Sequence, residues 1–466
     1  MAAPQREHSR NLASQPAPSH PERGETDNAT VSDAGMTKLC SVAVVAGALA
    51  GVVGAAFRQC LVWVDEFRVD SVHRLHEWPL VGWVVPVAAA AVAVALARFL
   101  VTLVPTAAGS GIQHVEACVR SQVEPETAGV IPVKFFGGLL AIGSGLVLGR
   151  EGPTVQMAAA IGSKTSRALS MSHDDQNVMQ ASLAGAGLGI AFNAPVAGAV
   201  FVVEELTKST RPRLIVASVL ATGSGVAVMR LLLGDLPDFT MPTLAPPTII
   251  GLLAFAGFGA VVGLLGAFYN RLILALIDVF ESLRQIPLLV RAAAVGAFVG
   301  LIGWFAPNIV GGGDNLTQDL LVGSLPALSV AGLLVLRWIL GPLSYSVGAP
   351  GGLFAPLLVL GAALGTLFGD ALNAVIPTLA PQATACALVG MAVFFTAVVR
   401  TPITGILLVV EMTANMSQLI PMMFACGAAV ITTTAIGSEP IYDTLRHRML
   451  ASDKSRGTHT AESTGT

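Results

Sequence analysis

The decisive stretch of this sequence is Gly149-Arg150-Glu151-Gly152-Pro153, which places two charged side chains among leucine, isoleucine, valine, alanine and glycine. An ionised group at bilayer depth costs at least about 2.5–3.5 kcal/mol, so such groups usually face a pathway, a partner or a cavity. Proline is favoured in the first turn of a helix, so Pro153 predicts a helix start here. Glu151 is then either a capping carboxylate or a tethered anion at a helix end where a free anion could bind.

The composition supports a membrane location. Hydrophobic residues make up 53% of the 466 residues and charged residues only 12%, which excludes an ordinary soluble globular protein. A membrane-spanning helix needs about 20 apolar residues, and the chain has on the order of a dozen segments near or somewhat below that length. Many of them are interrupted by some of the 49 glycines and 27 prolines. We therefore predict an all-α integral membrane protein, in contact with membrane lipid, whose broken helices line a polar pathway.

Other ligand classes find little support in the sequence. The net charge of −3 and the lack of an extended basic cluster indicate that nucleic acid is not a partner. The five cysteines form no Cys-x-x-Cys pair and lie in or beside apolar segments, so we interpret them as small buried apolar residues. The eight histidines show no metal-site spacing. We expect neither a metal nor a cofactor.

The chain divides into four parts by composition. We expect a disordered polar N-terminal tail over residues 1–36 and a first membrane repeat over residues 37–235. A second membrane repeat covers residues 236–450, and a short polar C-terminal tail covers residues 451–466.

The two repeats carry the same pattern of residues. Pro195 precedes Glu204 at the offset at which Pro402 precedes Glu411. A second pair of helix starts matches as well, with proline and glycine at equal offsets in Pro153 with Gly162 and in Pro356 with Gly365. Paired repeats with interrupted helices favour a transporter-like fold whose site lies at the repeat interface.

Basic residues indicate the orientation in the membrane. They follow the apolar segments at two places, Lys208, Arg211 and Arg213 in the first repeat and Arg446, Arg448 and Lys454 at the end. The positive-inside rule predicts that both ends of the chain are cytoplasmic, which places Glu205 near the cytoplasmic face.

Three further elements could contribute to an anion site. The run Gly109-Ser110-Gly111 permits a sharp turn that presents backbone N–H groups and a hydroxyl, although a membrane serine more commonly bonds back to its own helix. The run Gly352-Leu353-Phe354-Ala355-Pro356 predicts a glycine-led helix start, either with free amides facing an anion or as plain helix entry. Tyr442 could donate its hydroxyl to an anion or lie in an interfacial aromatic belt.

These motifs resemble, in order, those of the CLC family of chloride channels and chloride/proton antiporters. The matching residues are Gly109-Ser110-Gly111-Ile112, Gly149-Arg150-Glu151-Gly152-Pro153, Gly352-Leu353-Phe354-Ala355-Pro356 and Tyr442, with supporting runs at residues 132–138 and 191–195. The resemblance covers residues 39–449 and is closest to the prokaryotic type, which lacks a C-terminal CBS regulatory domain. It implies a CLC-type fold of two inverted repeats with broken, re-entrant helices, and a homodimer with one pathway in each subunit.

The resemblance also implies roles for individual residues. Ser110 and Tyr442 would hold the central chloride with the Leu353 and Phe354 amides, and Glu151 would be the gate. The remaining matched positions would contribute to anion binding, namely Gly111, Ile112, Gly149, Arg150 and Gly152. Lys134 and Arg150 supply buried positive charge that raises anion occupancy, or else form ion pairs within the fold.

A second carboxylate separates the two branches of the family. Antiporters resemble one another in having a glutamate that matches Glu205 and takes up protons from the cytoplasm, whereas channels commonly lack it. Glu204 matches an accessory position for gating and proton transfer, and its repeat mate Glu411 is expected to make a structural or interface contact. The resemblance therefore implies a chloride/proton antiporter in a cell membrane of the bacterial inner-membrane type. The alternative is a passive voltage- or pH-gated chloride channel.

The sequence departs from the family pattern at one position. Gln113 stands where the family usually has proline, which removes a helix-starting residue beside the inner vestibule.

An intramembrane serine protease built on Ser110 is a further alternative. It lacks a base, because no histidine lies in an apolar segment after His114, so we expect no enzyme.

Overall fold

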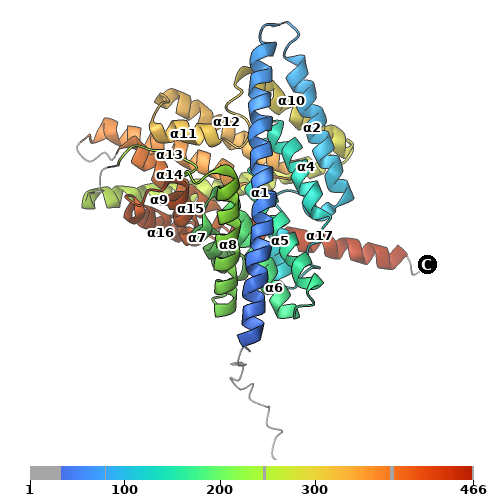
Figure 1. Cartoon of the computed structure of the whole chain (residues 1–466). Coiled ribbons are helices and arrows are strands. Elements are labelled where there is room, and N and C mark those ends of the chain that lie inside the picture. Colours follow the sequence, from blue (N-terminus) through green and yellow to red (C-terminus); the bar gives the residue numbers. More distant parts are fainter. Residues whose placement is uncertain (1–32, 79, 245–247, 378–381, 464–466) are drawn as a thin grey trace, which may run out of the picture.

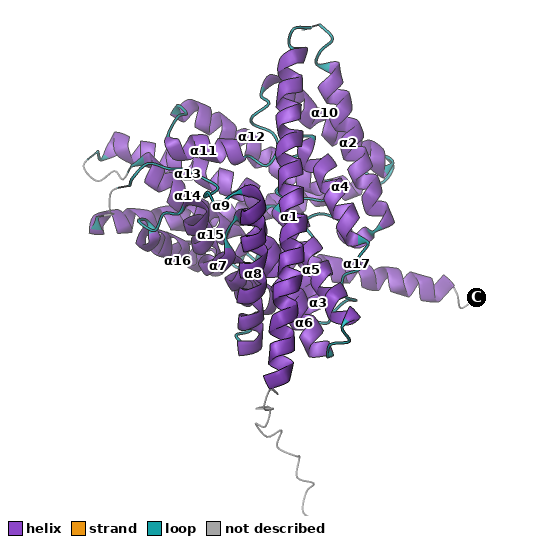
Figure 2. Ribbon diagram, in the orientation of Figure 1, coloured by secondary structure: helices purple, strands orange, loops and turns teal. Residues whose placement is uncertain are grey.

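The computed structural model describes residues 33–78, 80–244, 248–377 and 382–463. This part of the chain consists of helices joined by loops and contains no strand (Figure 2). Its one isolated β-bridge joins Gly149 to Gly352. The N-terminal tail predicted over residues 1–36 lies almost entirely outside the described residues.

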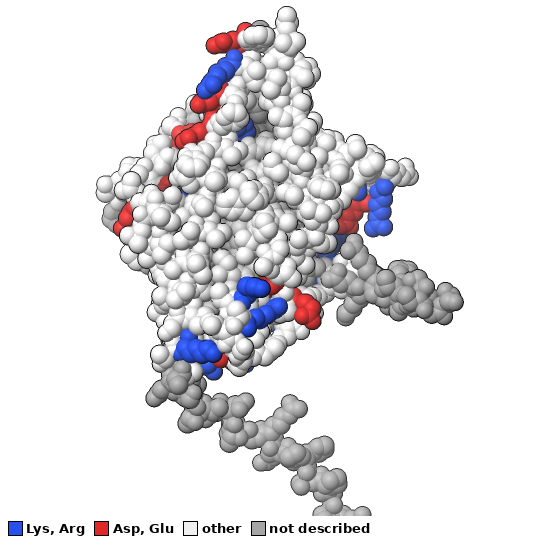
Figure 3. Space-filling view, turned by 45° about the vertical axis from the view of Figure 1, so that its right-hand side comes forward, with Lys and Arg blue, Asp and Glu red and all other residues white. Residues whose placement is uncertain are grey.

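Seven of the described helices are long and apolar enough to cross a membrane. They are α1 (Asp33–Leu75), α2 (Val84–Leu103), α8 (Pro212–Leu233), α9 (Ile249–Ser282), α10 (Leu288–Phe305), α12 (Ala327–Ser346) and α13 (Phe354–Val375). Helix α1 runs through most of the height of the molecule in Figure 1, with α8 beside it. Charged side chains leave the middle of the face in Figure 3 free and gather towards its margins. The predicted all-α membrane fold is confirmed.

The remaining helices are shorter or less apolar. They are α3 (Ile112–Val119), α4 (Val130–Gly143), α5 (Glu151–Ala168), α6 (His173–Phe192), α7 (Pro195–Phe201), α11 (Asp314–Val322), α14 (Ala383–Val399), α15 (Pro402–Thr413), α16 (Leu419–Ala435) and α17 (Ile441–Ser463). Two irregular turns complete the set, a 3₁₀ turn at Pro105–Ala107 and a π-helical turn at Val202–Thr207. Several of these helices begin inside the molecule, so their free amides face protein.

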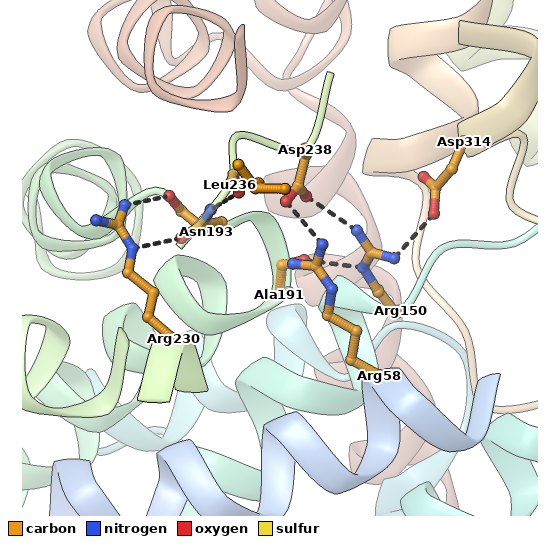
Figure 4. Close-up of polar contacts among 8 residues, drawn as sticks. All are labelled: Arg58, Arg150, Ala191, Asn193, Arg230, Leu236, Asp238 and Asp314. Atoms are coloured by element: carbon orange, nitrogen blue, oxygen red, sulfur yellow. Dashed lines mark hydrogen bonds and ion pairs between the residues drawn. The ribbon is translucent and has the colours of Figure 1, made fainter. Parts of the chain in front are cut away.

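The break between α6 and α7 illustrates how the sequence interrupts an apolar run. Asn193 adopts a left-handed conformation with φ 53° and ends α6, and Pro195 begins α7. Asparagine tolerates this conformation better than other non-glycine residues, and proline suits the first turn of a helix. The Asn193 side chain is held by Arg230 and by the Leu236 carbonyl oxygen (Figure 4). The apolar run is therefore split into two helices.

The matching glutamates of the two repeats each bind the start of a helix in the other repeat. The Glu204 carboxylate accepts hydrogen bonds from the Ile403 and Thr404 amides at the start of α15. The Glu411 carboxylate accepts hydrogen bonds from the Val196 and Ala197 amides at the start of α7, at 3.0 and 2.8 Å. Each glutamate thus satisfies the free amides of its partner helix. The structural contact predicted for Glu411 is confirmed.

The described end of the chain is helical. Helix α17 begins at Ile441 and continues to Ser463, through most of the segment predicted as a short polar tail over residues 451–466. The start of this helix is buried, and its end projects away from the body of the molecule in Figure 1. Between the two repeats, α8 ends at Leu233 and α9 begins at Ile249.

Candidate functional site

Four helix starts that are distant in the sequence meet in the interior of the molecule. They belong to α3, which follows Ser110, to α5, which begins at Glu151, to α13, which begins at Phe354, and to α17, which carries Tyr442. A Cβ atom on Gly152 would lie 2.7 Å from the Ser110 Oγ, which shows how closely α5 approaches the serine turn. The Phe354 and Tyr442 rings pack with centroids 5.6 Å apart. The structure thus brings all four predicted motifs together.

The Glu151 side chain reaches from its own helix to the start of another. Its Oε1 accepts a hydrogen bond of 2.6 Å from the Phe354 amide, 203 residues away in the sequence. The carboxylate is fully buried, and its Oε2 has no hydrogen-bond partner among the described groups. A carboxylate at the start of α13 is stabilised by free amides and by the helix dipole. This contact favours the interpretation of Glu151 as a tethered anion.

Two glycines, which have no side chain, provide the space that the Glu151 carboxylate occupies. Gly149 and Gly352 exchange backbone hydrogen bonds of 2.8 Å in each direction. A Cβ atom on Gly149 would lie 2.0 Å from Glu151 Oε2, and one on Gly352 would lie 2.0 Å from Glu151 Oε1. The glycines of both motifs are therefore required by close approach of the carboxylate.

Three hydroxyl groups surround the serine turn without protein partners. The Ser110, Tyr345 and Tyr442 hydroxyls are buried; both tyrosine hydroxyls lie close to Ser110, and none of the three makes a hydrogen bond of good geometry to another described group. Tyr345 lies near the end of α12, and its hydroxyl would be 3.3 Å from a Cβ atom on Gly109. A buried donor without a partner is costly, so such groups usually mark a place for a ligand or water. Tyr345 lies outside the conspicuous motifs, so no local pattern in the sequence indicates it.

Lys134 lies directly behind the serine turn. Its ammonium group is fully buried and donates to the carbonyl oxygens of Gly109 and Ser110, at 2.7 and 3.0 Å. No described carboxylate lies within ion-pair distance of it. Lys134 therefore holds the turn through two hydrogen bonds to its carbonyl oxygens, rather than through the ion pair considered as an alternative.

Arg150 belongs to a network of ion pairs beside the site (Figure 4). Its guanidinium group contacts Asp238 at 3.2 Å and Asp314 at 2.8 Å, and it donates to the Ala191 carbonyl oxygen. Arg58 contacts the other oxygen of Asp238 at 2.7 Å. A cavity of about 220 Å³ lies against Arg150, Gly149 and Asp314. The ion-pair alternative for Arg150 is thus confirmed, and direct anion binding by its side chain has no support in these contacts.

Glu205 differs from its neighbour Glu204. Both lie in the π-helical turn Val202–Thr207, an irregularity that occurs frequently at functional sites. Thr404 supplies Glu204 with two of its hydrogen bonds, from its amide and from its hydroxyl, so both Glu204 oxygens are engaged at α15. Glu205 is 2% exposed, and its Oε1 has no partner among the described residues. Of these two glutamates, Glu205 alone has a buried carboxylate oxygen without a described hydrogen-bond partner.

Aromatic side chains connect the two carboxylates. The Phe354 ring contacts Phe395 and Phe201, with centroids 4.6 and 6.0 Å apart, in addition to Tyr442. Phe201 immediately precedes the turn that carries Glu205. Tyr442 lies within electrostatic reach of both Glu151 and Glu205. The anion site and the second carboxylate therefore share one buried cluster.

The departure at Gln113 does not prevent helix formation. Helix α3 begins at Ile112, preceded by Gly109 and Gly111 in left-handed conformations with φ 59° and 82°. Gln113 lies in its first turn, and its side-chain oxygen is buried without a described partner. The turn predicted from Gly-Ser-Gly is confirmed, and the proline is dispensable for it.

A fold of broken helices whose starts meet around a buried carboxylate is typical of membrane proteins of the ion-transport class. The family model for the voltage gated chloride channel matches residues 88–434, so the chain belongs to this family, the CLC family. Its fold is the CLC-type fold of two inverted repeats with broken, re-entrant helices.

Relatives and solved structures agree with the family assignment. The chain is 37% identical to the H(+)/Cl(−) exchange transporter ClcA of Vibrio parahaemolyticus, over 89% of this chain and 90% of that protein. It is 34% identical to ClcA of Salmonella paratyphi A, over 88% of each. The crystal structure of a slow cyanobacterial Cl⁻/H⁺ antiporter superposes with a TM-score of 0.85 at 28% identity, covering 89% of this chain and 98% of that one.

Proposed function

We propose that this protein exchanges chloride for protons across the membrane. The observation that carries the proposal is the Glu151 carboxylate at the start of α13, beside the unpartnered hydroxyls of Ser110 and Tyr442. When ionised, Glu151 competes with chloride for the amides and hydroxyls. When protonated, it loses its attraction to the helix start and admits chloride. Competition between proton and chloride at one site couples their movements. The relatives named as H(+)/Cl(−) exchange transporters support this reading.

The buried Glu205 favours exchange over passive conduction. It offers a second proton-binding group on the side of the molecule where Lys208 and Asp443 form an ion pair. A proton can pass between this group and Glu151 through the buried cluster around Tyr442, whereas a channel needs no second proton-binding carboxylate. Glu204 is assigned a structural role in this proposal.

The decisive experiment uses purified protein in liposomes with a chloride gradient, no proton gradient and controlled voltage. We expect protons to move uphill at the expense of the chloride gradient, recorded as a change in internal pH. Chloride flux with constant internal pH would instead identify a passive channel.

Two copies are proposed to associate in a cell membrane of the bacterial inner-membrane type, with both ends of each chain cytoplasmic. The groups of the anion site all come from one chain, so each subunit would hold its own pathway. Chemical cross-linking in liposomes tests the association, and labelling of the two ends tests the orientation.

Gly149→Ala is expected to weaken coupling without altering the chemistry of any site group. The three atoms nearest to the new methyl group all belong to the Glu151 carboxyl group, so the flexible side chain must leave its position at α13. We expect chloride to cross while fewer protons move per chloride ion in the liposome assay. Gly257→Ala is the matched control, since a Cβ atom there meets nothing within 4 Å.

A combined variant makes this prediction sharper. Adding Gly149→Ala to Glu151→Ala should cause no further change in coupling, because the methyl group then has nothing to displace. An additional loss in the combined variant would contradict the proposed displacement.

Tyr345→Phe and Tyr442→Phe are each expected to weaken chloride binding at least about tenfold, since a hydrogen bond to a charged group contributes about 1.5–3 kcal/mol. Isothermal titration of purified protein with chloride measures this effect. Tyr269→Phe is the matched control, because Tyr269 packs against Trp338 and Phe394 instead. Unchanged binding in Tyr345→Phe would remove that hydroxyl from the anion site.

A further inference from the structure

A histidine, a cysteine and a glutamate lie close together on α3, which follows the serine turn, and in the loop after it. His114 and Cys118 lie one turn apart on α3, and Glu126 lies in the loop that follows. One ligand atom of each lies within 4.8 Å of the others, and all three residues are buried. The sequence shows no conventional metal-site spacing, yet the one-turn interval from histidine to cysteine is a signal that could have indicated this cluster.

The distances within this cluster suit a transition metal ion. His114 Nδ1 lies 2.7 Å from Glu126 Oε1 and 3.4 Å from Cys118 Sγ. Tetrahedral Zn²⁺, with Zn–N of about 2.0–2.1 Å and Zn–S of about 2.3 Å, holds nitrogen and sulfur roughly 3.5 Å apart. The histidine and cysteine are therefore already at ligand spacing, and Glu126 needs a small outward shift.

A second observation points towards a ligand. Glu126 Oε2 is buried and has no hydrogen-bond partner among the described residues. Its Oε1 accepts hydrogen bonds from both His114 and Gln156, so one oxygen of the carboxylate has two partners and the other has none. A buried carboxylate oxygen without a partner is costly, and a cation would satisfy it. Imidazole, thiolate and carboxylate together form a donor set typical of zinc.

We propose that His114, Cys118 and Glu126 bind a divalent transition metal ion of the Zn²⁺ type, and that its binding slows ion exchange. As the ion binds, the thiol proton of Cys118 and the Nδ1 proton that His114 donates to Glu126 both leave to water, and the imidazole keeps its Nε2 proton. The thiolate and the carboxylate then balance the two positive charges. The fourth position is open to water or to the Glu124 carbonyl oxygen, which already accepts a hydrogen bond from Cys118 Sγ at 3.1 Å. Glu124 is exposed, so the cluster lies one layer beneath the surface.

The expected inhibition follows from the contacts of Gln156. This side chain on α5 donates to Glu126 and to the Thr106 carbonyl oxygen, at 2.7 and 2.8 Å. Its amide group also packs against Gly111, where a Cβ atom would lie 2.0 Å from Gln156 Oε1. A metal ion would link α3 to the loop that carries Glu126, and the outward shift of Glu126 would break its hydrogen bond with Gln156. The serine turn and the helix that carries Glu151 would both lose a positioning contact.

Binding is tested first, with Zn²⁺ and Co²⁺ alone as probes on chelator-treated purified protein. We expect one Zn²⁺ per chain by isothermal titration, and a near-ultraviolet thiolate-to-metal absorption band with Co²⁺. Cys118→Ser preserves a donor towards Glu124 but supplies a poor zinc ligand. It should lose the band and weaken Zn²⁺ binding at least about tenfold. Cys60→Ser, on α1, is the matched control and should retain both. Glu126→Gln tests the same cluster should Cys118→Ser fail to fold.

Exchange is then measured in liposomes with Zn²⁺ on both sides. Zn²⁺ should slow exchange severalfold in the unmodified protein and in Cys60→Ser, reversibly on addition of chelator, and should not slow Cys118→Ser. Absence of binding, or binding that survives both Cys118→Ser and Glu126→Gln, would overturn the site and leave the cluster as a hydrogen-bonded group. Binding without slower exchange would overturn the inhibition. The Co²⁺ band does not depend on antiport, so its outcome is independent of the proposed function.

Discussion

Glu151→Gln is expected to reduce proton movement to the level of empty liposomes while chloride still crosses. Glutamine nearly preserves the shape of the side chain but cannot carry a proton or an anionic charge. The charge-assisted hydrogen bond to the Phe354 amide, which contributes about 1.5–3 kcal/mol in such pairs, is lost. Chloride then meets a weaker competitor for the start of α13. Internal pH and released chloride, recorded together in the same liposomes, measure both parts of the prediction.

Glu411→Gln is a suitable control for this experiment. It changes a glutamate of equal size whose carboxylate also accepts amide hydrogen bonds at a helix start. We expect this variant to lower thermal stability and to keep the ratio of protons to chloride. Preserved proton coupling in Glu151→Gln would refute the gate assignment.

Glu205→Gln is expected to stop proton movement by a different route. The buried side chain keeps its volume, so the surrounding cluster should remain packed. The variant lacks the group that takes up protons, while the anion site around Ser110 and Tyr442 is unaltered. Chloride should therefore still cross, and chloride titration should give the affinity of the unmodified protein. The pH-sensitive dye signal in liposomes should be absent.

Glu204→Gln tests whether the two adjacent glutamates, Glu204 and Glu205, have different roles. Its carboxylate oxygens are held by the amides at the start of α15, so the change weakens a helix contact. We expect lower thermal stability with an unchanged ratio of protons to chloride. Equal losses of proton movement in Glu204→Gln and Glu205→Gln would show that the turn acts as a unit and would end the separate assignment.

The fold could be predicted largely from the sequence because its main features are local. Apolar segments, a proline at the first turn of a helix and the matched offsets from Pro195 to Glu204 and from Pro402 to Glu411 each leave a readable pattern. The extension of α17 to Ser463 was missed. The composition of that segment is polar, and composition alone does not distinguish an exposed helix from a tail.

The candidate site was predicted only where it coincides with motifs. Ser110, Glu151, Phe354 and Tyr442 lie in recognisable runs, and the structure brings them together. Tyr345 and the ion-pair partners of Arg150 come from segments with no such signal, since their proximity arises only from tertiary packing. Distances between helices, unlike helix starts, are not encoded in local spacing.

The contacts of Glu204 and Glu411, each with a helix start in the other repeat, have a consequence for biosynthesis. The amides that Glu204 binds lie 199 and 200 residues later in the chain. At a translation rate of about 5–20 residues per second, they emerge roughly 10–40 s after Glu204 itself. During that interval the first repeat holds an uncompensated carboxylate among apolar helices, and the start of α7 lacks Glu411. The first repeat therefore cannot complete its own helix-start contacts, and both repeats reach their final hydrogen bonding only after the second has been made.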